Sequence, residues 1–316
     1  GSGRAGAGED RRISAGMYAG GSLRRKGVDG MRRKDVIADL LAASREGYAV
    51  PHFNFASFFE LEAIMEAAAE LEAPVFAASL PKVTETYGPA VLRAAADELM
   101  RRTGARVYLH LDHSRSVTLC KEAVDAGYDS VMIDASRLPL GENIAAISEV
   151  AEYAHARDCA VEGEVGKIKS RGDEGDYQGE DCLVQAGDAL AAAEESGADY
   201  LAVAIGTAHG FYQGEPKIDL QRLEDVAAKV KIPLVLHGGT GVPQADVRAC
   251  IKGGIAKVNV GTIIRYTYLS RLREEIERQG ALTPPVDLIC PSVTDSVKEV
   301  VKGWIEVCMA ERRTVC

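Results

Sequence analysis

Short runs of apolar, β-branched residues alternate along the chain with longer stretches rich in alanine, leucine and glutamate. Such runs are typical of buried parallel strands, and each stretch between them has the length of one helix. The predicted strands are residues 48–55, 74–79, 106–113, 130–136, 159–165, 200–206, 233–238 and 256–261. Eight strand–helix units in succession predict a (β/α)₈ TIM barrel. The alternative is a doubly wound open sheet, which usually has a glycine-rich first turn, whereas residues 51–55 contain no glycine.

Three segments depart from this alternation. Residues 166–186 form a long, polar, glycine-bearing stretch, which in a compact barrel indicates a lid, a binding loop or disorder. Residues 293–309 predict an extra C-terminal helix after the barrel. Residues 1–30 are rich in glycine and arginine and have no periodic apolar face. We expect them to be a tag or a disordered arm, with Met31 as the native start and residues 31–316 as one domain.

Composition and charge exclude several classes of protein. Hydrophobic residues make up 47% and charged residues 27% of the 316 residues, which is typical of a globular protein. The net charge of −10 disfavours nucleic acid or an anionic membrane as a partner, but a small anionic substrate remains possible. No apolar run is long enough to predict a transmembrane helix. Seven cysteines without a C-x-x-C pair indicate free thiols in a reducing, cytoplasmic setting.

Polar residues follow the predicted strands at their carboxyl ends, where a barrel carries its chemistry. The strand bodies before these points are apolar, and buried polar groups cost free energy unless they are paired. The residues at this end are Asn54, Ser79, Asp112, His113, Asp134, Glu164, His209, His237 and Asn259. The pattern therefore predicts a functional site at this end of the barrel.

Three of the six histidines, His113, His209 and His237, end different strands. Three neutral imidazoles that leave one position open suit a catalytic Zn²⁺ ion. The alternative is three separate histidines, each hydrogen-bonded at the rim of the barrel. We interpret the other three, His52, His110 and His155, as structural, and we expect His155 to be solvated on its helix. Asp112, next to a predicted metal ligand, is the natural general base.

Glycines after the last strands indicate a phosphate site. Barrels often bind phosphate with the loops after strands seven and eight, through backbone N–H groups and a helix N-terminus. Gly238 and Gly239 would let the backbone approach an anion, and Thr240 and Thr262 would add hydroxyl groups. Arg265, one turn into the last helix of the barrel, either meets a second phosphate or lies on the surface. These residues predict a metal-dependent barrel enzyme that acts on a phosphorylated small molecule.

Six motifs make the sequence similar to a known family. They are HLDH (110–113), SVMIDAS (130–136), VEGEVG (161–166), AVAIGTAHG (202–210), LVLHGGTGVP (234–243) and KVNVGT (257–262). They resemble the class II, zinc-dependent ketose-bisphosphate aldolases, above all the branch of tagatose- and fructose-bisphosphate aldolases, over about residues 31–280. The resemblance implies reversible cleavage of a ketose 1,6-bisphosphate to dihydroxyacetone phosphate and an aldehyde such as glyceraldehyde 3-phosphate, through a zinc-stabilised enediolate.

The resemblance also implies a role for each matching position. His113, His209 and His237 would bind zinc, Glu164 would bind it in an alternative position, and Asp112 would take the proton of the C4 hydroxyl. Arg265 would meet the far phosphate. The positions implied to contact the substrate are Asn54, Ser79, Gly210, Gly238, Gly239, Thr240, Asn259, Val260, Gly261 and Thr262. The family often carries a monovalent cation, Na⁺ or K⁺, near the phosphate loops, and it suggests a homodimer or homotetramer with residues 293–309 as a candidate contact.

The sequence departs from the family pattern at three places, of which the first is Ser114 after HLDH, where the family often has histidine or glycine. Position 261 is glycine, where fructose-type members have aspartate and tagatose-type members have alanine. Residues 167–174 (KIKSRGDE) lack the usual glycine pair before the acidic residues of the lid. The catalytic lid acid is therefore a choice between Asp173 and Glu174, of which we assign Glu174. The basic residues of this segment either meet a different anionic substrate or form a solvated loop.

Several other functions compete with this interpretation. An aldolase of the same family could act on a different ketose 1-phosphate. A class I aldolase would need a Schiff-base lysine, for which Lys257 is the candidate inside a strand. A zinc amidohydrolase would need H-x-H on the first strand, which residues 51–54 lack. A non-catalytic sugar-phosphate sensor would keep the barrel and lack the lid acid.

Overall fold

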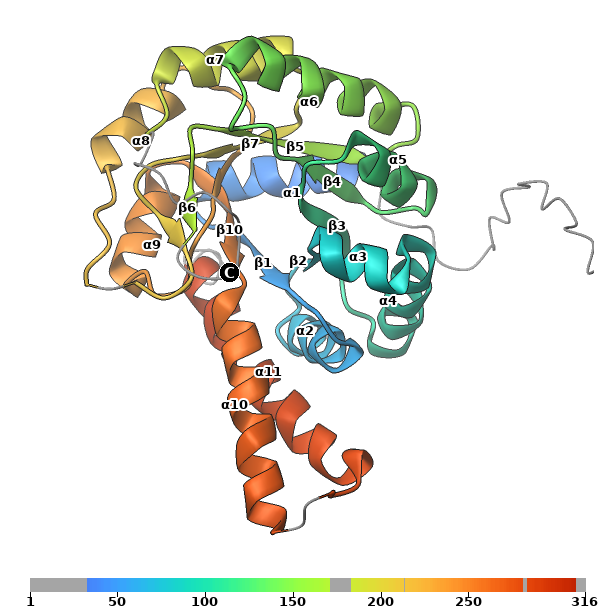
Figure 1. Cartoon of the computed structure of the whole chain (residues 1–316). Coiled ribbons are helices and arrows are strands. Elements are labelled where there is room, and N and C mark those ends of the chain that lie inside the picture. The colour runs from blue at the N-terminus through green and yellow to red at the C-terminus, as the bar shows by residue number, and fades with distance from the viewer. Residues whose placement is uncertain (1–32, 171–182, 213, 281–282, 311–316) are drawn as a thin grey trace, which may run out of the picture.

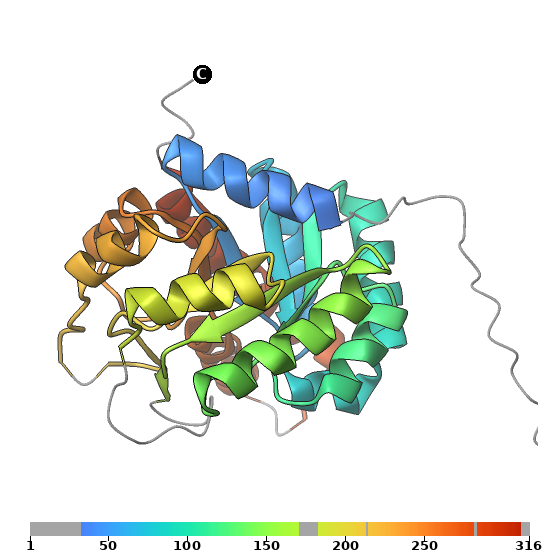
Figure 2. The same cartoon turned by 90° about the horizontal axis from the view of Figure 1, so that it is seen from above.

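Eight parallel strands close into a barrel (Figures 1 and 2). The structure is a computed structural model, described here over residues 33–170, 183–212, 214–280 and 283–310. The strands follow one another around the barrel in the order β1-β10-β9-β7-β5-β4-β3-β2. Their bounds are β1 Val50–Asn54, β2 Val75–Ser79, β3 Val107–Ser114, β4 Ser130–Ile133, β5 Ala160–Val165, β7 Tyr200–Val203, β9 Leu234–Leu236 and β10 Ile255–Val260. The eight predicted strands and the TIM-barrel fold are confirmed.

A ring of helices covers the outside of the barrel (Figure 2). Its members are α2 Phe58–Glu70, α3 Pro81–Tyr87, α4 Pro89–Thr103, α5 Val117–Asp125, α6 Leu140–His155, α7 Ala186–Glu195, α8 Leu220–Ala227 and α9 Gln244–Lys252. Three of them, α2, α5 and α8, begin after a residue whose side chain accepts from a backbone N–H of the first turn. In α2, for example, the Ser57 side chain accepts from the N–H of Glu60, and the Glu60 side chain accepts from the N–H of Ser57, which is a capping box.

The helix α1 (Arg33–Glu46) closes the end of the barrel at which the strands begin. Its residues Val36, Leu40 and Ala43 are fully buried. The hydroxyl of Tyr108, near the start of β3, donates to the backbone oxygen of Asp35 at 3.0 Å and to the side chain of Asp39 at 2.6 Å. The opposite end, where the strands finish, is left open for a site.

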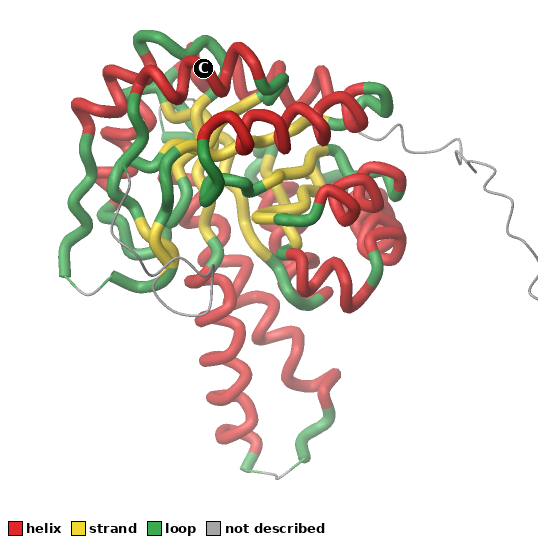
Figure 3. Tube along the Cα trace, turned by 45° about the horizontal axis from the view of Figure 1, so that its top comes forward, coloured by secondary structure: helices red, strands yellow, loops and turns green. Residues whose placement is uncertain are grey.

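The last two helices, α10 (Thr262–Gln279) and α11 (Val286–Cys308), form a hairpin that projects from the barrel (Figures 1 and 3). The predicted extra helix is present, but it begins at Val286 rather than at residue 293. Its Val297 and Val301 are fully buried, and the helix packs against α2 and β1. The apolar side of residues 293–309 is therefore used inside the chain.

The segment after β5 leaves the barrel as a short strand, β6 (Lys169–Ser170), which pairs with β8 (Ala208–His209). The two candidate lid acids, Asp173 and Glu174, lie outside the described residues, as do residues 1–30, the expected tag or arm. Among the described helices, none combines the length and the apolar character needed to cross a membrane.

Candidate active site

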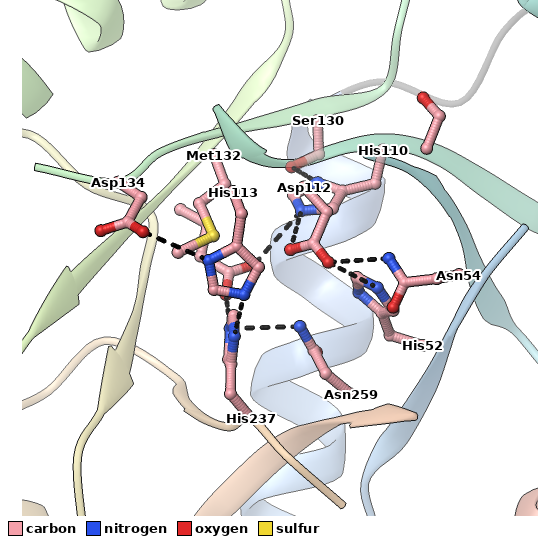
Figure 4. Close-up of polar contacts among 12 residues, drawn as sticks. His52, Asn54, His110, Asp112, His113, Ser130, Met132, Asp134, His237 and Asn259 are labelled. Carbon is pink, nitrogen blue, oxygen red and sulfur yellow. Dashed lines mark hydrogen bonds and ion pairs between the residues drawn. The ribbon is translucent and has the colours of Figure 1, made fainter. Parts of the chain in front are cut away.

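The three histidines expected to bind metal converge at the carboxyl end of the barrel (Figure 4 shows two of them). The ring centroid of His113 lies 4.7 Å from that of His209 and 4.7 Å from that of His237, and the last two are 5.8 Å apart. His237 Nδ1 and His113 Nε2 are 2.9 Å from each other. One nitrogen from each of the three rings can therefore reach a single ion.

An irregularity in β3 presents two successive side chains to this site. Neighbouring residues in a regular strand point to opposite faces. The pairing of β3 with β4 shifts register between Leu111 and Ser114, and His113 has a φ of +49°. Backbone in this left-handed region is costly for a residue other than glycine and is found mainly where function requires it. The shift allows both Asp112 and His113 to line the same pocket.

Carboxylates behind two of the rings fix their orientation and tautomer (Figure 4). Glu162 Oε1 lies 2.8 Å from His237 Nε2, and Asp134 Oδ2 lies 3.4 Å from His113 Nδ1. A ring that donates one N–H to a carboxylate presents the lone pair of its other nitrogen. The facing nitrogens of His237 and His113 then need a proton or a metal cation between them. The donor set thus fits a divalent metal such as Zn²⁺.

The pKa values of the rings follow from the same surroundings. Burial, followed by the charge of His113, holds the pKa of His209 well below its usual value. Burial likewise lowers the pKa of His237. Although burial opposes it, the charges of Asp112 and Asp134 raise the pKa of His113 to about 10. The cluster therefore favours two neutral rings and one positive charge, which a metal ion would supply.

Asp112 is held next to the histidines by residues of β1 (Figure 4). Asn54 Nδ2 donates to Asp112 Oδ2 at 2.8 Å, and His52 Nε2 lies 3.4 Å from the same oxygen. The other oxygen, Oδ1, is buried and has no hydrogen-bond partner among the described residues. Burial raises the pKa of Asp112, but His113 and His52 outweigh it and bring the pKa well below its ordinary value. Asp112 is thus a fixed carboxylate with one free acceptor.

A buried polar layer supports the site from inside the barrel. Lys257 Nζ donates to Glu162 Oε2 at 2.8 Å and to Asn259 Oδ1 at 2.7 Å, and Lys257 is fully buried. A Schiff-base lysine must reach a substrate carbonyl. Lys257 lines neither of the two pockets at this end of the barrel, so its position disfavours the class I alternative.

The first pocket, about 50 Å³, lies among the histidines and the glycine-rich loops. Gly238 has a φ of +70°, and a Cβ there would lie 2.4 Å from the backbone oxygen of Ala208. A Cβ at Gly261 would lie 2.6 Å from Asn54 Oδ1, so glycine at this position leaves room for the side chain that holds Asp112. The lining residues are Asn54, Leu80, Asp112, His113, His209, Gly210, His237, Gly238, Thr240, Asn259, Gly261 and Thr262.

Four residues expected to contact the substrate line neither of the two pockets, whereas Glu164, expected near the metal, lies within ligand reach of His113. Gly239, Val260 and Arg265 do not line either pocket. Ser79 is fully buried, and its hydroxyl bonds to Thr84 at 2.8 Å and to Tyr128 at 3.1 Å. Glu164 lies on the floor of a second, larger pocket beside Asp134 and His113. Burial and the charge of Asp134 raise its pKa to about 8.

The sequence analysis assigned no site role to Glu162, Asp134, His52 or His110. Glu162 and Glu164 are two residues apart and therefore share a face of β5, which could have indicated that both point into the barrel. His52 and His110 are fully buried in the layer below Asp112, which agrees with a structural role. The contact of His155 agrees with a structural role but not with the expected solvation, because its Nε2 lies 3.0 Å from Asp199 Oδ2 and its side chain is 25% exposed.

A parallel barrel with convergent histidines and a buried acid at its carboxyl end defines a class of metal-assisted acid–base enzymes. Comparison with known families is more specific. The model of the family "Fructose-bisphosphate aldolase class-II" matches residues 35–313. The chain therefore belongs to the class II fructose-bisphosphate aldolase family, as the motifs predicted.

Solved structures of aldolases agree with this assignment. The YdjI aldolase from Escherichia coli K12 is 27% identical, with a TM-score of 0.76 over 87% of this chain and 96% of that one. A putative fructose-1,6-biphosphate aldolase from Coccidioides immitis is also 27% identical, with a TM-score of 0.78 over 86% and 94%. The fructose-bisphosphate aldolase of Campylobacter jejuni, at 21% identity, a TM-score of 0.76 and coverage of 88% and 95%, supports the fold alone.

Proposed function

We propose that the chain is a zinc-dependent aldolase that reversibly cleaves a ketose 1,6-bisphosphate of the fructose or tagatose type. The products would be dihydroxyacetone phosphate and an aldehyde. The observation that carries the proposal is the convergence of His113, His209 and His237 beside Asp112, with Glu162 and Asp134 behind two of the rings. Membership of the class II family supports the reaction class.

In this proposal the three histidines hold the metal and Asp112 moves the proton. A divalent ion bound there polarises a carbonyl oxygen and stabilises negative charge that develops on it. Asp112 accepts the proton of the substrate's C4 hydroxyl at its free Oδ1, while Asn54 holds Oδ2. The low pKa of Asp112 keeps its side chain in the carboxylate form.

The glycine-rich loops bind the phosphate of the dihydroxyacetone half. Gly210, Gly238 and Gly261 line the first pocket, where an absent Cβ exposes the backbone to an anion. Thr240 and Thr262 add hydroxyl groups to the same wall. Thr262 begins α10, so the positive end of that helix faces this part of the pocket.

The experiment that tests the proposal combines metal analysis with turnover. Chelator-treated protein should lose cleavage of fructose or tagatose 1,6-bisphosphate and regain it with added Zn²⁺. The variant His209→Ala should lose bound zinc and cleavage together, because His209 supplies one of only three nitrogens. Full cleavage after complete removal of metal would refute the metal mechanism, and no turnover of either bisphosphate by the zinc-loaded protein would refute the substrate class.

A further inference from the structure

The open end of the barrel is divided into two unlike halves, with the histidines between them. The first pocket lies over β1, β8, β9 and β10 and is bordered by glycines. The second pocket lies over β2, β3, β4 and β5, which are neighbours in the barrel. Leu80, His113 and His209 line both pockets. A substrate held at the histidines can therefore extend from one half into the other.

The second pocket is surrounded by positive charge. A basic residue that lines the pocket follows each of β2, β3, β4 and β5 within four residues of the end of the strand. These residues are Lys82, Arg115, Arg137 and Lys167. Lys82, Arg115 and Arg137 are exposed at the mouth, whereas the carboxylates of Asp134 and Glu164 are buried at the floor. Among the described residues that line the pocket, only Glu85 adds an exposed carboxylate to this wall. On a chain with a net charge of −10, such a wall is a local exception that attracts anions.

The two pockets also differ in volume. The first measures about 50 Å³, which has room for a small group but not for a six-carbon sugar with two phosphates. The second measures about 500 Å³, within the range of about 300–1,000 Å³ that is usual for ligand sites. One half of a ketose bisphosphate thus fits at the glycines, and the other half needs the second pocket.

We propose that the second pocket binds the aldehyde half of the substrate, and that Arg115 and Arg137 bind a phosphate at its far end. This inference rests on the proposed aldolase function and assigns its specificity. A guanidinium group binds a phosphate dianion through two parallel hydrogen bonds. The arginine that the family resemblance suggests for this phosphate, Arg265, lines neither pocket.

The test uses condensation, since it does not depend on which ketose is natural. Zinc-loaded protein is given dihydroxyacetone phosphate with either racemic glyceraldehyde 3-phosphate or racemic glyceraldehyde, and kcat/KM is measured for each aldehyde. The variants are Arg115→Gln, Arg137→Gln and the double variant. Arg157→Gln is the matched control. Arg157 is an exposed arginine that pairs with Asp125. It follows the C-terminus of α6, whereas Arg137 precedes the N-terminus of the same helix. All three substituted positions are exposed, and thermal melts of the four variants check that the fold is kept.

We expect the wild type to prefer the phosphorylated aldehyde, and each pocket arginine to contribute about tenfold to this preference. Rates with unphosphorylated glyceraldehyde should stay within about twofold in every variant. The control variant should keep the full preference. A wild type without the preference, or pocket variants that keep it, would overturn the inference.

A separate measurement distinguishes this failure from failure of the proposed function. Exchange of a C3 proton of dihydroxyacetone phosphate with D₂O needs only the metal, an acid–base group and the first pocket. Wild type and variants should show equal exchange by NMR. If the wild type exchanges the proton but shows no preference for the phosphorylated aldehyde in condensation, only the proposed role of the second pocket is overturned. No exchange in the zinc-loaded wild type overturns the aldolase function and, with it, the inference.

Discussion

The aspartates at the two ends of the barrel differ in how completely their carboxylates are hydrogen-bonded. At the end where the strands begin, Asp199 accepts a bond of 2.6 Å from Arg33 and one of 2.9 Å from the backbone N–H of Val161, and it lies 3.0 Å from His155 Nε2. Asp129 at the same end accepts from Arg93 at 2.9 Å and from the N–H of Leu109 at 2.8 Å. These carboxylates tie helices to the starts of strands, and their charges are satisfied within the chain.

At the end where the strands finish, buried polar atoms lack partners. Asp112 Oδ1, Glu164 Oε2 and His110 Nε2 are buried and make no hydrogen bond to the described residues. Such atoms cost free energy, so folded proteins keep few of them. We infer that the fold accepts this cost where a ligand is to supply the missing partner. The satisfied Asp199 and Asp129 therefore indicate stability, and the unsatisfied oxygens of Asp112 and Glu164 indicate chemistry.

Among the substitutions that test this comparison, Asp112→Asn should have the largest effect. The substitution keeps the shape of the side chain but removes its basicity, so we expect turnover to fall by about 10²–10⁴-fold. Bound zinc and the thermal midpoint should stay near those of the wild type, because Asp112 is not one of the three metal-holding histidines and its charge is not needed for packing. Cleavage assays, metal analysis and melts measure the three quantities. A variant that cleaves normally would show that another group takes the proton.

The sequence predicted the barrel well and its strand ends less well. A parallel strand buried on both faces must be apolar throughout, so each strand is visible as a run. The fourth strand was predicted to reach residue 136 but ends at Ile133. The chain turns there because Asp134 Oδ1 accepts from the N–H and the hydroxyl of Ser136. Side chains that accept from a nearby backbone N–H end a strand, and the apolar pattern does not show this.

Within the site, the sequence indicated residues at strand ends but not the partners behind them. His113, His209 and His237 each follow an apolar run, so their convergence could be predicted from the barrel alone. Glu162 lies inside a strand, and its pairing with His237 spans 75 residues. Asp199 and His155 likewise meet only after α6 has packed on the barrel. Long-range pairs of this kind depend on depth and rotation within the fold, which local patterns do not encode.

A satisfied carboxylate should show the opposite behaviour to Asp112. We expect Asp199→Asn to lower the free energy of unfolding by about 3 kcal/mol, because it weakens several buried bonds to a charged group. The value of kcat should not change, since the substitution lies at the far end of the barrel. Urea unfolding and cleavage assays measure the two effects. If Asp199→Asn lowered turnover without lowering stability, aspartates at the end where the strands begin would not be purely structural.

The pH dependence sharpens this test. Burial opposes the charged form of Asp199, but bonds with His155, Arg33 and the Val161 N–H lower its pKa below the ordinary value. The stability that the charge contributes is present above the unfolded pKa of about 3.9 and is lost as the pH falls through the lower folded pKa. The difference between the wild type and Asp199→Asn should therefore shrink only in acid. A difference that stays constant down to the acid transition would mean that charge is not its source.

The smallest effect should come from Asp134→Asn, which is matched to Asp199→Asn because both aspartates face a histidine. Asp134 Oδ2 lies 3.4 Å from His113 Nδ1, whereas Asp199 Oδ2 lies 3.0 Å from His155 Nε2. Asparagine can still accept the imidazole N–H through its oxygen, but it no longer supplies the negative charge that makes the other ring nitrogen a better ligand. We expect zinc affinity to fall by about 10–100-fold, with little change in the stability of the metal-free protein.

Zinc titration against a competing chelator, with melts of the metal-free proteins, separates the two aspartate–histidine pairs. Asp134→Asn should weaken zinc binding and spare the fold, while Asp199→Asn should weaken the fold and spare zinc binding. Turnover of Asp134→Asn at saturating zinc should approach the wild-type value, because the proton acceptor Asp112 is unchanged. If Asp134→Asn instead destabilised the metal-free protein and bound zinc normally, this carboxylate would belong with the structural aspartates. Position at the carboxyl end of the barrel would then be a poor guide to chemistry.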